Sequence, residues 1–168
     1  SEWRERALWI SFQAGPRLPP DRHHKDQGHF EAYRGKDWLL VDAGNSEGGA
    51  TLNHNCMLVD DGAELITYSP NQGVWGTEVR TTRYGDDGRA VVVVGDVGDA
   101  WAPACVRDGC TERAVDSATR TLAFVRPSLL VIEDRMKLDD TDARTTWAAH
   151  VTAAPEIADR RPSVVVGA

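Results

Sequence analysis

The feature that most constrains this chain is its pattern of short apolar runs between turn-forming residues. Runs of about five to eight residues, rich in Val, Ile, Leu, Thr and aromatics, are separated by Gly, Asp, Asn and Pro, a pattern that predicts β-strands and little helix. We expect strands at residues 7–13, 28–33, 38–42, 55–60, 64–68, 77–84, 89–94, 119–125, 129–134, 145–152 and 163–166.

Turn chemistry at the junctions indicates that neighbouring strands pair as antiparallel hairpins. Asp60-Asp61-Gly62 and Asp86-Asp87-Gly88 each place a glycine where a hairpin turn needs a positive φ. Eleven short strands are too many to form a single small open sheet. We therefore predict an all-β fold of two packed antiparallel sheets, a large β-sandwich of the supersandwich type. The length fits one domain, residues 1–168.

Charge and hydropathy exclude two classes of partner. The chain carries 19 Lys and Arg against 26 Asp and Glu, a formal charge of −7, whereas nucleic-acid-binding modules are usually basic. No apolar run reaches the roughly 18 residues needed to span a bilayer. The cysteines leave the redox state open: Cys105 and Cys110 flank a short turn and could form a disulfide, although an odd number of cysteines favours free thiols.

Four of the five histidines lie within residues 23–54, on either side of Asp42. Zinc binds imidazole nitrogen and carboxylate oxygen together, so two His and one Asp form a sufficient protein ligand set with water. His24, Asp42 and His54 stand at the ends of three neighbouring predicted strands, which could bring them to one rim. Composition alone favours the alternative, that these are ordinary loop and strand-edge residues.

The order of the motifs adds a resemblance. The string His24-x-Asp26-x-Gly28-x-Phe30 is followed by a strand, a Gly turn, a second strand ending Asp42-x-Gly44, and then His54-Asn55-x-x-x-Val59. Together with the runs at 92–96, 120–127 and 130–135, this order resembles the β-sandwich domain of the heparinase II/III-like polysaccharide lyases, which include exo-acting alginate and oligoalginate lyases. The likeness covers roughly residues 5–166.

The resemblance implies a divalent metal, usually zinc, bound by His24, Asp42 and His54 and organising the loops around a cleft. It also implies β-elimination on a uronic-acid polysaccharide such as a glycosaminoglycan or alginate, in which a base removes the proton α to the carboxylate and an acid protonates the leaving oxygen. In the family, the acid and base lie largely on a preceding helical α/α toroid domain. We therefore expect a fragment of a larger, secreted or periplasmic lyase, inactive alone and forming one wall of the cleft.

Contacts to an anionic polysaccharide are expected from the basic loop at residues 17–25. Arg22 and His23 are the first choices, because a guanidinium fork matches carboxylate and sulfate oxyanions, and Asn55 is a third candidate for substrate binding. Family members often carry a histidine where this chain has Arg22, and the neighbouring His23 is the catalytic candidate that this chain offers instead. The alternative function is a non-catalytic carbohydrate-binding or structural β-sandwich domain.

The chain has six tryptophans, whose faces could stack on sugar rings. Trp9, Trp38 and Trp147 fall in predicted strands and are expected in the core. Trp75 and Trp101 lie among loop-forming residues and are the predicted exposed ones.

Overall fold

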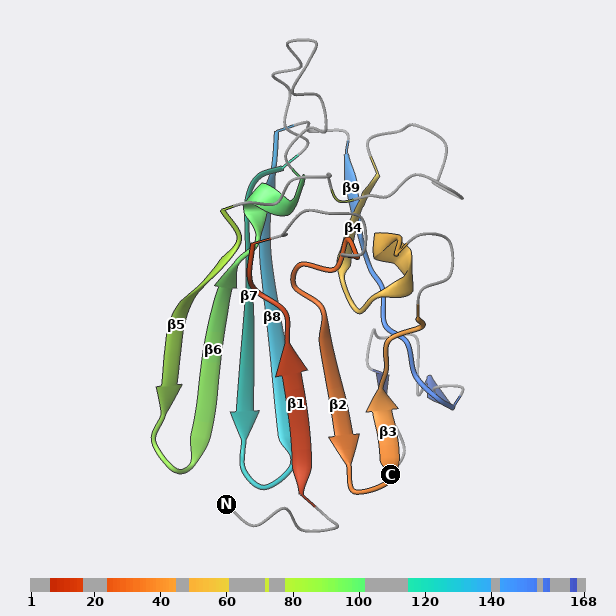
Figure 1. Ribbon diagram of the computed structural model, residues 1–168, viewed down its shortest axis with the longest axis vertical. Coiled ribbons are helices and arrows are strands. Elements are labelled where there is room, and N and C mark those ends of the chain that lie inside the picture. The colour runs from red at the N-terminus through yellow and green to blue at the C-terminus, as the bar shows by residue number, and fades with distance from the viewer. Residues whose placement is uncertain are drawn as a thin grey trace.

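The computed structural model describes residues 7–16, 24–44, 49–60, 72, 78–101, 115–139, 143–153, 156–157 and 164–165. Within them the chain forms β-strands and two short 3₁₀ turns but no α-helix, and every strand pair is antiparallel (Figure 1). This confirms the predicted all-β fold. Among the described residues, none belongs to a helix of the length and apolarity that crossing a membrane requires.

A three-stranded sheet carries the N-terminal part of the chain. It consists of β1 (Leu8–Phe12), β2 (Phe30–Arg34) and β3 (Asp37–Leu40), in that order. Gly35, at φ 61°, opens the tight turn between β2 and β3, where a left-handed residue favours glycine. An irregularity near Ala32 and Tyr33 places one extra residue on β3.

A four-stranded meander follows, made of β5 (Arg80–Asp86), β6 (Ala90–Asp96), β7 (Val115–Val125) and β8 (Leu129–Leu138). The β5–β6 turn forms where the sequence predicts it. Gly88 has a φ of 84°, its N–H donates to the Asp86 carboxylate at 2.8 Å, and the Ala90 N–H donates to the Asp87 carboxylate at 2.7 Å. Local side-chain bonds of this kind fix the turn.

Two smaller pairs complete the described strands. β4 (Met57–Asp60) pairs with β9 (Arg144–Trp147), and β10 (Glu156–Ile157) pairs with β11 (Val164–Val165). The turn η2 (Thr51–Asn53) precedes β4, and η3 (Gly98–Trp101) follows β6. The predicted strand at 64–68 lies outside the described residues, and β10 was not predicted.

The two larger sheets meet through β1, which packs on the four-stranded sheet. A Cβ added to Gly95 on β6 would come within 2.8 Å of both Phe12 and Ala14, so only glycine allows this approach. Beside the contact, a cleft of about 460 Å³ is lined by side chains of β1, β6 and β7, among them Phe12, Val93 and Phe124.

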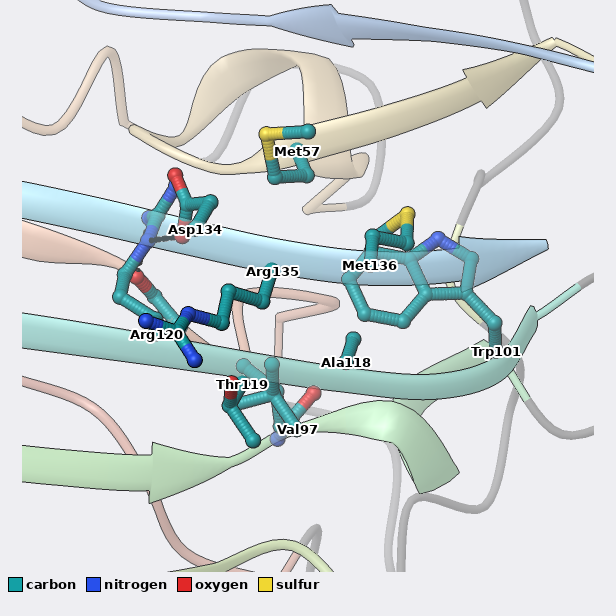
Figure 2. Close-up of a pocket in the computed structure, with 11 residues that line it drawn as sticks. Met57, Val97, Trp101, Ala118, Thr119, Arg120, Asp134, Arg135 and Met136 are labelled. Atoms are coloured by element: carbon teal, nitrogen blue, oxygen red, sulfur yellow. Dashed lines mark hydrogen bonds and ion pairs between the residues drawn. The ribbon is translucent and has the colours of Figure 1, made fainter.

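A compact apolar cluster lies where β4, η3 and β7 meet. It contains Val59, Val79, Val97, Ala100, Trp101, Val115 and Ala118. Figure 2 shows the Trp101 ring beside Met136, next to a cavity of about 10 Å³, room for about one water molecule. The prediction that Trp101 is exposed is therefore wrong, because η3 turns its side chain inward to an exposed fraction of 6%.

The expectation for the strand tryptophans is also wrong. Trp9, Trp38 and Trp147 keep exposed fractions of 40%, 57% and 42%. Strand alternation places them on one face of a sheet, but it does not say whether another layer covers that face.

Candidate metal centre

The candidate site lies in the loops at one end of the three-stranded sheet. His24 belongs to the segment leading into β2, Asp42 follows β3 by two residues, and His54 caps the end of η2. Gly49 allows these loops to close, because at φ 71° a Cβ there would lie 2.7 Å from the His24 ring. The Lys25 N–H donates to the Gly49 carbonyl at 2.9 Å and holds the two loops together.

His54 is the central residue of the site. Its side chain is fully buried, and among the described residues neither ring nitrogen has a hydrogen-bond partner of good geometry. The His24 ring lies 5.0 Å away between centroids, and Asp42 Oδ2 lies 3.3 Å from His54 Nδ1. Burial lowers the pKa of His54 to about 4, against the opposing effect of Asp42, so the ring is neutral at pH 7 and has a lone pair to offer.

Two sets of potential ligand atoms gather around this imidazole, each within 4.8 Å of one another. One comprises His24, Asp26 and His54, and the other comprises His29, Asp42 and His54. The predicted residues His24, Asp42 and His54 are thus divided between the two sets, which share His54. The described residues contain His/Asp groupings of a kind that can hold a metal ion.

His29 differs from the other two histidines in its hydrogen bonding. Its Nδ1 accepts the Asn55 backbone N–H at 2.9 Å, so in the neutral ring the proton is on Nε2. That Nε2 is buried and lies 3.9 Å from Asp42 Oδ2. A ring nitrogen that carries a proton cannot bind a metal. With its proton on Nε2, His29 is not set up to bind an ion; that nitrogen has no hydrogen-bond partner among the described residues, and burial lowers the pKa of His29.

The carboxylate of Asp42 is oriented from the other side as well. Its Oδ1 accepts the Gly44 N–H at 2.6 Å, a bond typical of a local Asx turn. The other oxygen, Oδ2, therefore faces His54. The end of β3 and the turn that follows it determine which carboxylate oxygen lies next to the imidazole.

Asn55 is fully buried, and its side chain joins three segments. Nδ2 donates to the carbonyls of Phe30 at 2.7 Å and Val41 at 3.1 Å, and Oδ1 accepts the His150 N–H at 2.6 Å. A substrate contact would have to break one of these bonds. We therefore assign Asn55 to the framework that places its neighbour His54, rather than to substrate.

Beneath the loops lies a buried ion pair that the sequence analysis missed. Arg120 on β7 is 1% exposed and binds Asp134 on β8 through two parallel bonds, Nε to Oδ1 at 2.6 Å and Nη2 to Oδ2 at 2.8 Å (Figure 2). Its Nη1 donates to the carbonyls of Gly28 and Asn55. The guanidinium also lies 5.4 Å from the centre of the Phe30 ring, a cation–π contact.

Arg120 therefore ties the four-stranded sheet to the two backbone segments beside His29 and His54. The available signal was a lone arginine inside the otherwise uncharged strand run 117–125. A charge in such a run needs a buried partner.

The remaining predicted residues are placed as follows. Arg22 and His23, the predicted substrate contacts, lie outside the described residues, as do Cys105, Cys110 and the predicted exposed Trp75. Cys56 is a free, buried thiol whose pKa is raised by desolvation. Comparison with protein-family models and with curated proteins finds no match to this chain.

Proposed function

We propose that this chain is a metal-binding all-β domain in which His24, His54 and Asp42 hold a zinc ion or a similar divalent cation. The supporting observation is His54, a fully buried imidazole with both nitrogens lacking a well-formed hydrogen bond. Leaving such a group unsatisfied costs roughly 1–3 kcal/mol, and a bound cation would satisfy the nitrogen that carries the lone pair. A mixed set of imidazole nitrogen and carboxylate oxygen suits zinc better than calcium or magnesium.

The surrounding residues would act as supports for the ligands. His29 Nε2 lies 3.9 Å from Asp42 Oδ2, and Arg120 fixes the backbone carbonyl of Asn55, the residue directly after His54. Residues that orient metal ligands in this way raise affinity without touching the ion. Asp26, which lies in the set with His24 and His54, is the competing carboxylate.

On the motif resemblance, we extend the proposal to the β-domain of a secreted or periplasmic polysaccharide lyase. The domain would form one wall of a cleft for a uronic-acid polysaccharide, with Arg22 and His23 as proposed contacts to its carboxylate or sulfate groups. A helical α/α toroid domain would supply the acid and base of the β-elimination. The metal would organise the loops at the end of β2 and β3, without a required part in the chemistry.

The metal proposal is tested by elemental analysis of the purified chain after dialysis against zinc. We expect about one zinc ion per chain, lost in His54→Ala and in His24→Ala. His150→Ala is the matched control, because His150 contacts Asn55 Oδ1 through its backbone N–H as well as its ring, and it should keep the metal. Comparing Asp42→Ala with Asp26→Ala identifies the carboxylate ligand. A metal-free wild type, or equal zinc content in His54→Ala, would overturn the proposal.

The lyase proposal is tested by the ultraviolet band of an unsaturated uronate. We expect the 168-residue chain alone to give no band with heparin, alginate or hyaluronan, because it would lack the acid and base. A protein that joins this chain to the proposed helical α/α toroid domain should give the band with at least one uronate polysaccharide. Its failure with all of them would favour the non-catalytic alternative.

A further inference from the structure

Three aromatic side chains form a row across the three-stranded sheet, at the end away from the candidate metal centre. Trp9 on β1 pairs with Tyr33 on β2, and Tyr33 pairs with Trp38 on β3. Their ring centroids are separated by 5.0 Å and 5.1 Å, with interplanar angles of 48° and 83°. The rings are in continuous contact but step from one to the next, so they do not form a flat plane.

Among the described residues, the row lies on the opposite face of the sheet from the buried side chains of β2, and Trp9 also lines the cleft beside the four-stranded sheet. Trp9 and Trp38 are 40% and 57% exposed, whereas Phe30 and Ala32, which alternate with Tyr33 along β2, are 0% and 3% exposed. Trp9 and Trp38 are thus held at the surface by their contacts with the half-buried Tyr33 between them. Contiguous exposed aromatic surface of this kind marks an interaction site more often than a scattered exposed residue does.

A fixed polar group stands beside the rings. Glu31 precedes Tyr33 by two residues and so shares its face of β2. The Glu31 carboxylate accepts the Tyr33 hydroxyl at 2.6 Å and the Ser11 hydroxyl at 3.1 Å. Both bonds hold the carboxylate in one orientation. Aromatic faces next to a few oriented polar groups are typical of sites that bind small molecules, and this pair suits a sugar ring, which has an apolar C–H face and a hydroxyl edge.

We propose that Trp9, Tyr33 and Trp38 form a binding site for neutral pyranose units of a soluble oligosaccharide. Neutral units are favoured because the fixed charge of Glu31 would repel a uronate or sulfate placed against the rings. A single twisting chain is favoured over a crystalline surface because the rings are stepped.

This site is separate from the metal groupings. Tyr33 lies four residues from His29 along the chain, about 13 Å at roughly 3.3 Å per residue, and Glu31 stands between them. The inference therefore depends neither on the metal nor on the lyase proposal, and it applies equally to a non-catalytic domain.

The test is isothermal titration calorimetry of the purified chain with cellohexaose as the neutral probe and tri-galacturonate as the anionic probe, with tryptophan fluorescence as a second readout. We expect binding of cellohexaose, and weaker binding of tri-galacturonate. Trp38→Ala should lower the affinity for cellohexaose by about tenfold or more. The matched control is Val131→Ala, an exposed apolar residue on β8 outside the row and outside the cleft that Trp9 lines, which should stay within about twofold of the wild type.

Further variants make the result specific. Glu31→Gln should reduce the ratio of the affinity for cellohexaose to the affinity for tri-galacturonate, because it removes the charge that repels the anionic probe. Trp9→Ala repeats the test should Trp38→Ala melt at a lower temperature than the wild type. Binding should persist in EDTA, which separates this site from the metal centre. The proposal would be overturned by any of three results: no binding of cellohexaose by the wild type, equal losses in the tryptophan variants and Val131→Ala, or loss of binding in EDTA.

Discussion

Arg120 and His54 are both fully buried polar side chains, yet they differ in how their polar atoms are satisfied. The guanidinium binds Asp134 twice, two backbone carbonyls and an aromatic face. The imidazole of His54 lies close to Asp42, but neither nitrogen forms a good hydrogen bond with the described residues. Folding can place a charge in the interior only with compensating bonds. An imidazole left without them, next to other ligand-type atoms, therefore indicates a binding site rather than a structural one.

The variant with the largest expected effect is Arg120→Met, which tests whether the buried ion pair with Asp134 stabilises the fold. It leaves the Asp134 carboxylate without its cation and two carbonyls without a donor, so we expect a loss of about 3–5 kcal/mol in the free energy of unfolding. Urea denaturation at pH 7 measures it, with an unchanged m-value showing that only stability has changed. The matched control is Arg126→Met, which removes the exposed pair with Asp86 and should change stability little. Equal losses in the two variants would contradict a structural role for the buried pair.

The second test supplies zinc as the proposed partner of the buried His54 imidazole. Zinc at about one hundred times its dissociation constant should stabilise the wild type by roughly 2.7 kcal/mol, seen as a rise in melting temperature that EDTA reverses. His54→Leu should abolish the rise. In EDTA the same variant should stay within about 1 kcal/mol of the wild type, because replacing an unsatisfied polar group by an apolar one is nearly neutral.

Two results would contradict the contrast between the two buried groups. One is a zinc-dependent rise in melting temperature that survives in His54→Leu. The other is a loss in the metal-free variant as large as that of Arg120→Met, which would show that His54 already has its stabilising partners within the chain.

The smallest expected effect concerns Tyr33, a partly exposed group satisfied by one strong bond. Desolvation, the hydrogen bond to Glu31 and the charge of Glu31 raise the pKa of Tyr33 to about 12, from 10.0. The folded state then holds this proton more tightly than the unfolded chain. The stability contributed by Tyr33 is complete below pH 10 and is lost as the pH rises toward 12.

Near-ultraviolet titration of phenolate formation should show one tyrosine ionising near pH 12 in the wild type, and no such step in Tyr33→Phe. Urea midpoints between pH 9 and 11 should fall more steeply in the wild type than in Tyr33→Phe. Parallel midpoints would show that the bond to Glu31 does not persist in solution.

Much of the local structure could be predicted from the sequence. Most of the described strands lie within or overlap the predicted ranges, and the Asp86–Gly88 turn forms as its residues indicate, because alternation and turn chemistry depend on neighbours along the chain. The gathering of histidines and carboxylates around His54 followed from strand ends meeting at one rim, although His24 and Asp42 fall into separate sets that share His54. The arrangement within the cluster did not, because the proton position on His29 depends on a bond from Asn55, which lies in a distant segment.

The tryptophans also show that burial could not be predicted from the sequence alone. Hydrophobicity and strand position predicted that Trp9 and Trp38 would be buried and that Trp101 would be exposed. In the structure Trp9 and Trp38 are exposed and Trp101 is buried. Which face of a sheet receives a second layer is decided by packing between elements far apart in the sequence.

The sequence by itself determined an acidic, antiparallel all-β chain with histidines and a carboxylate gathered near strand ends, because these properties follow from composition and short-range pattern. Only the tertiary structure decided that Arg120 and Asp134 would meet in register under the loops, that His54 would be buried among potential ligands, and that an aromatic row would face solvent. These outcomes depend on contacts between distant segments, and such contacts exist only once the sheets have packed.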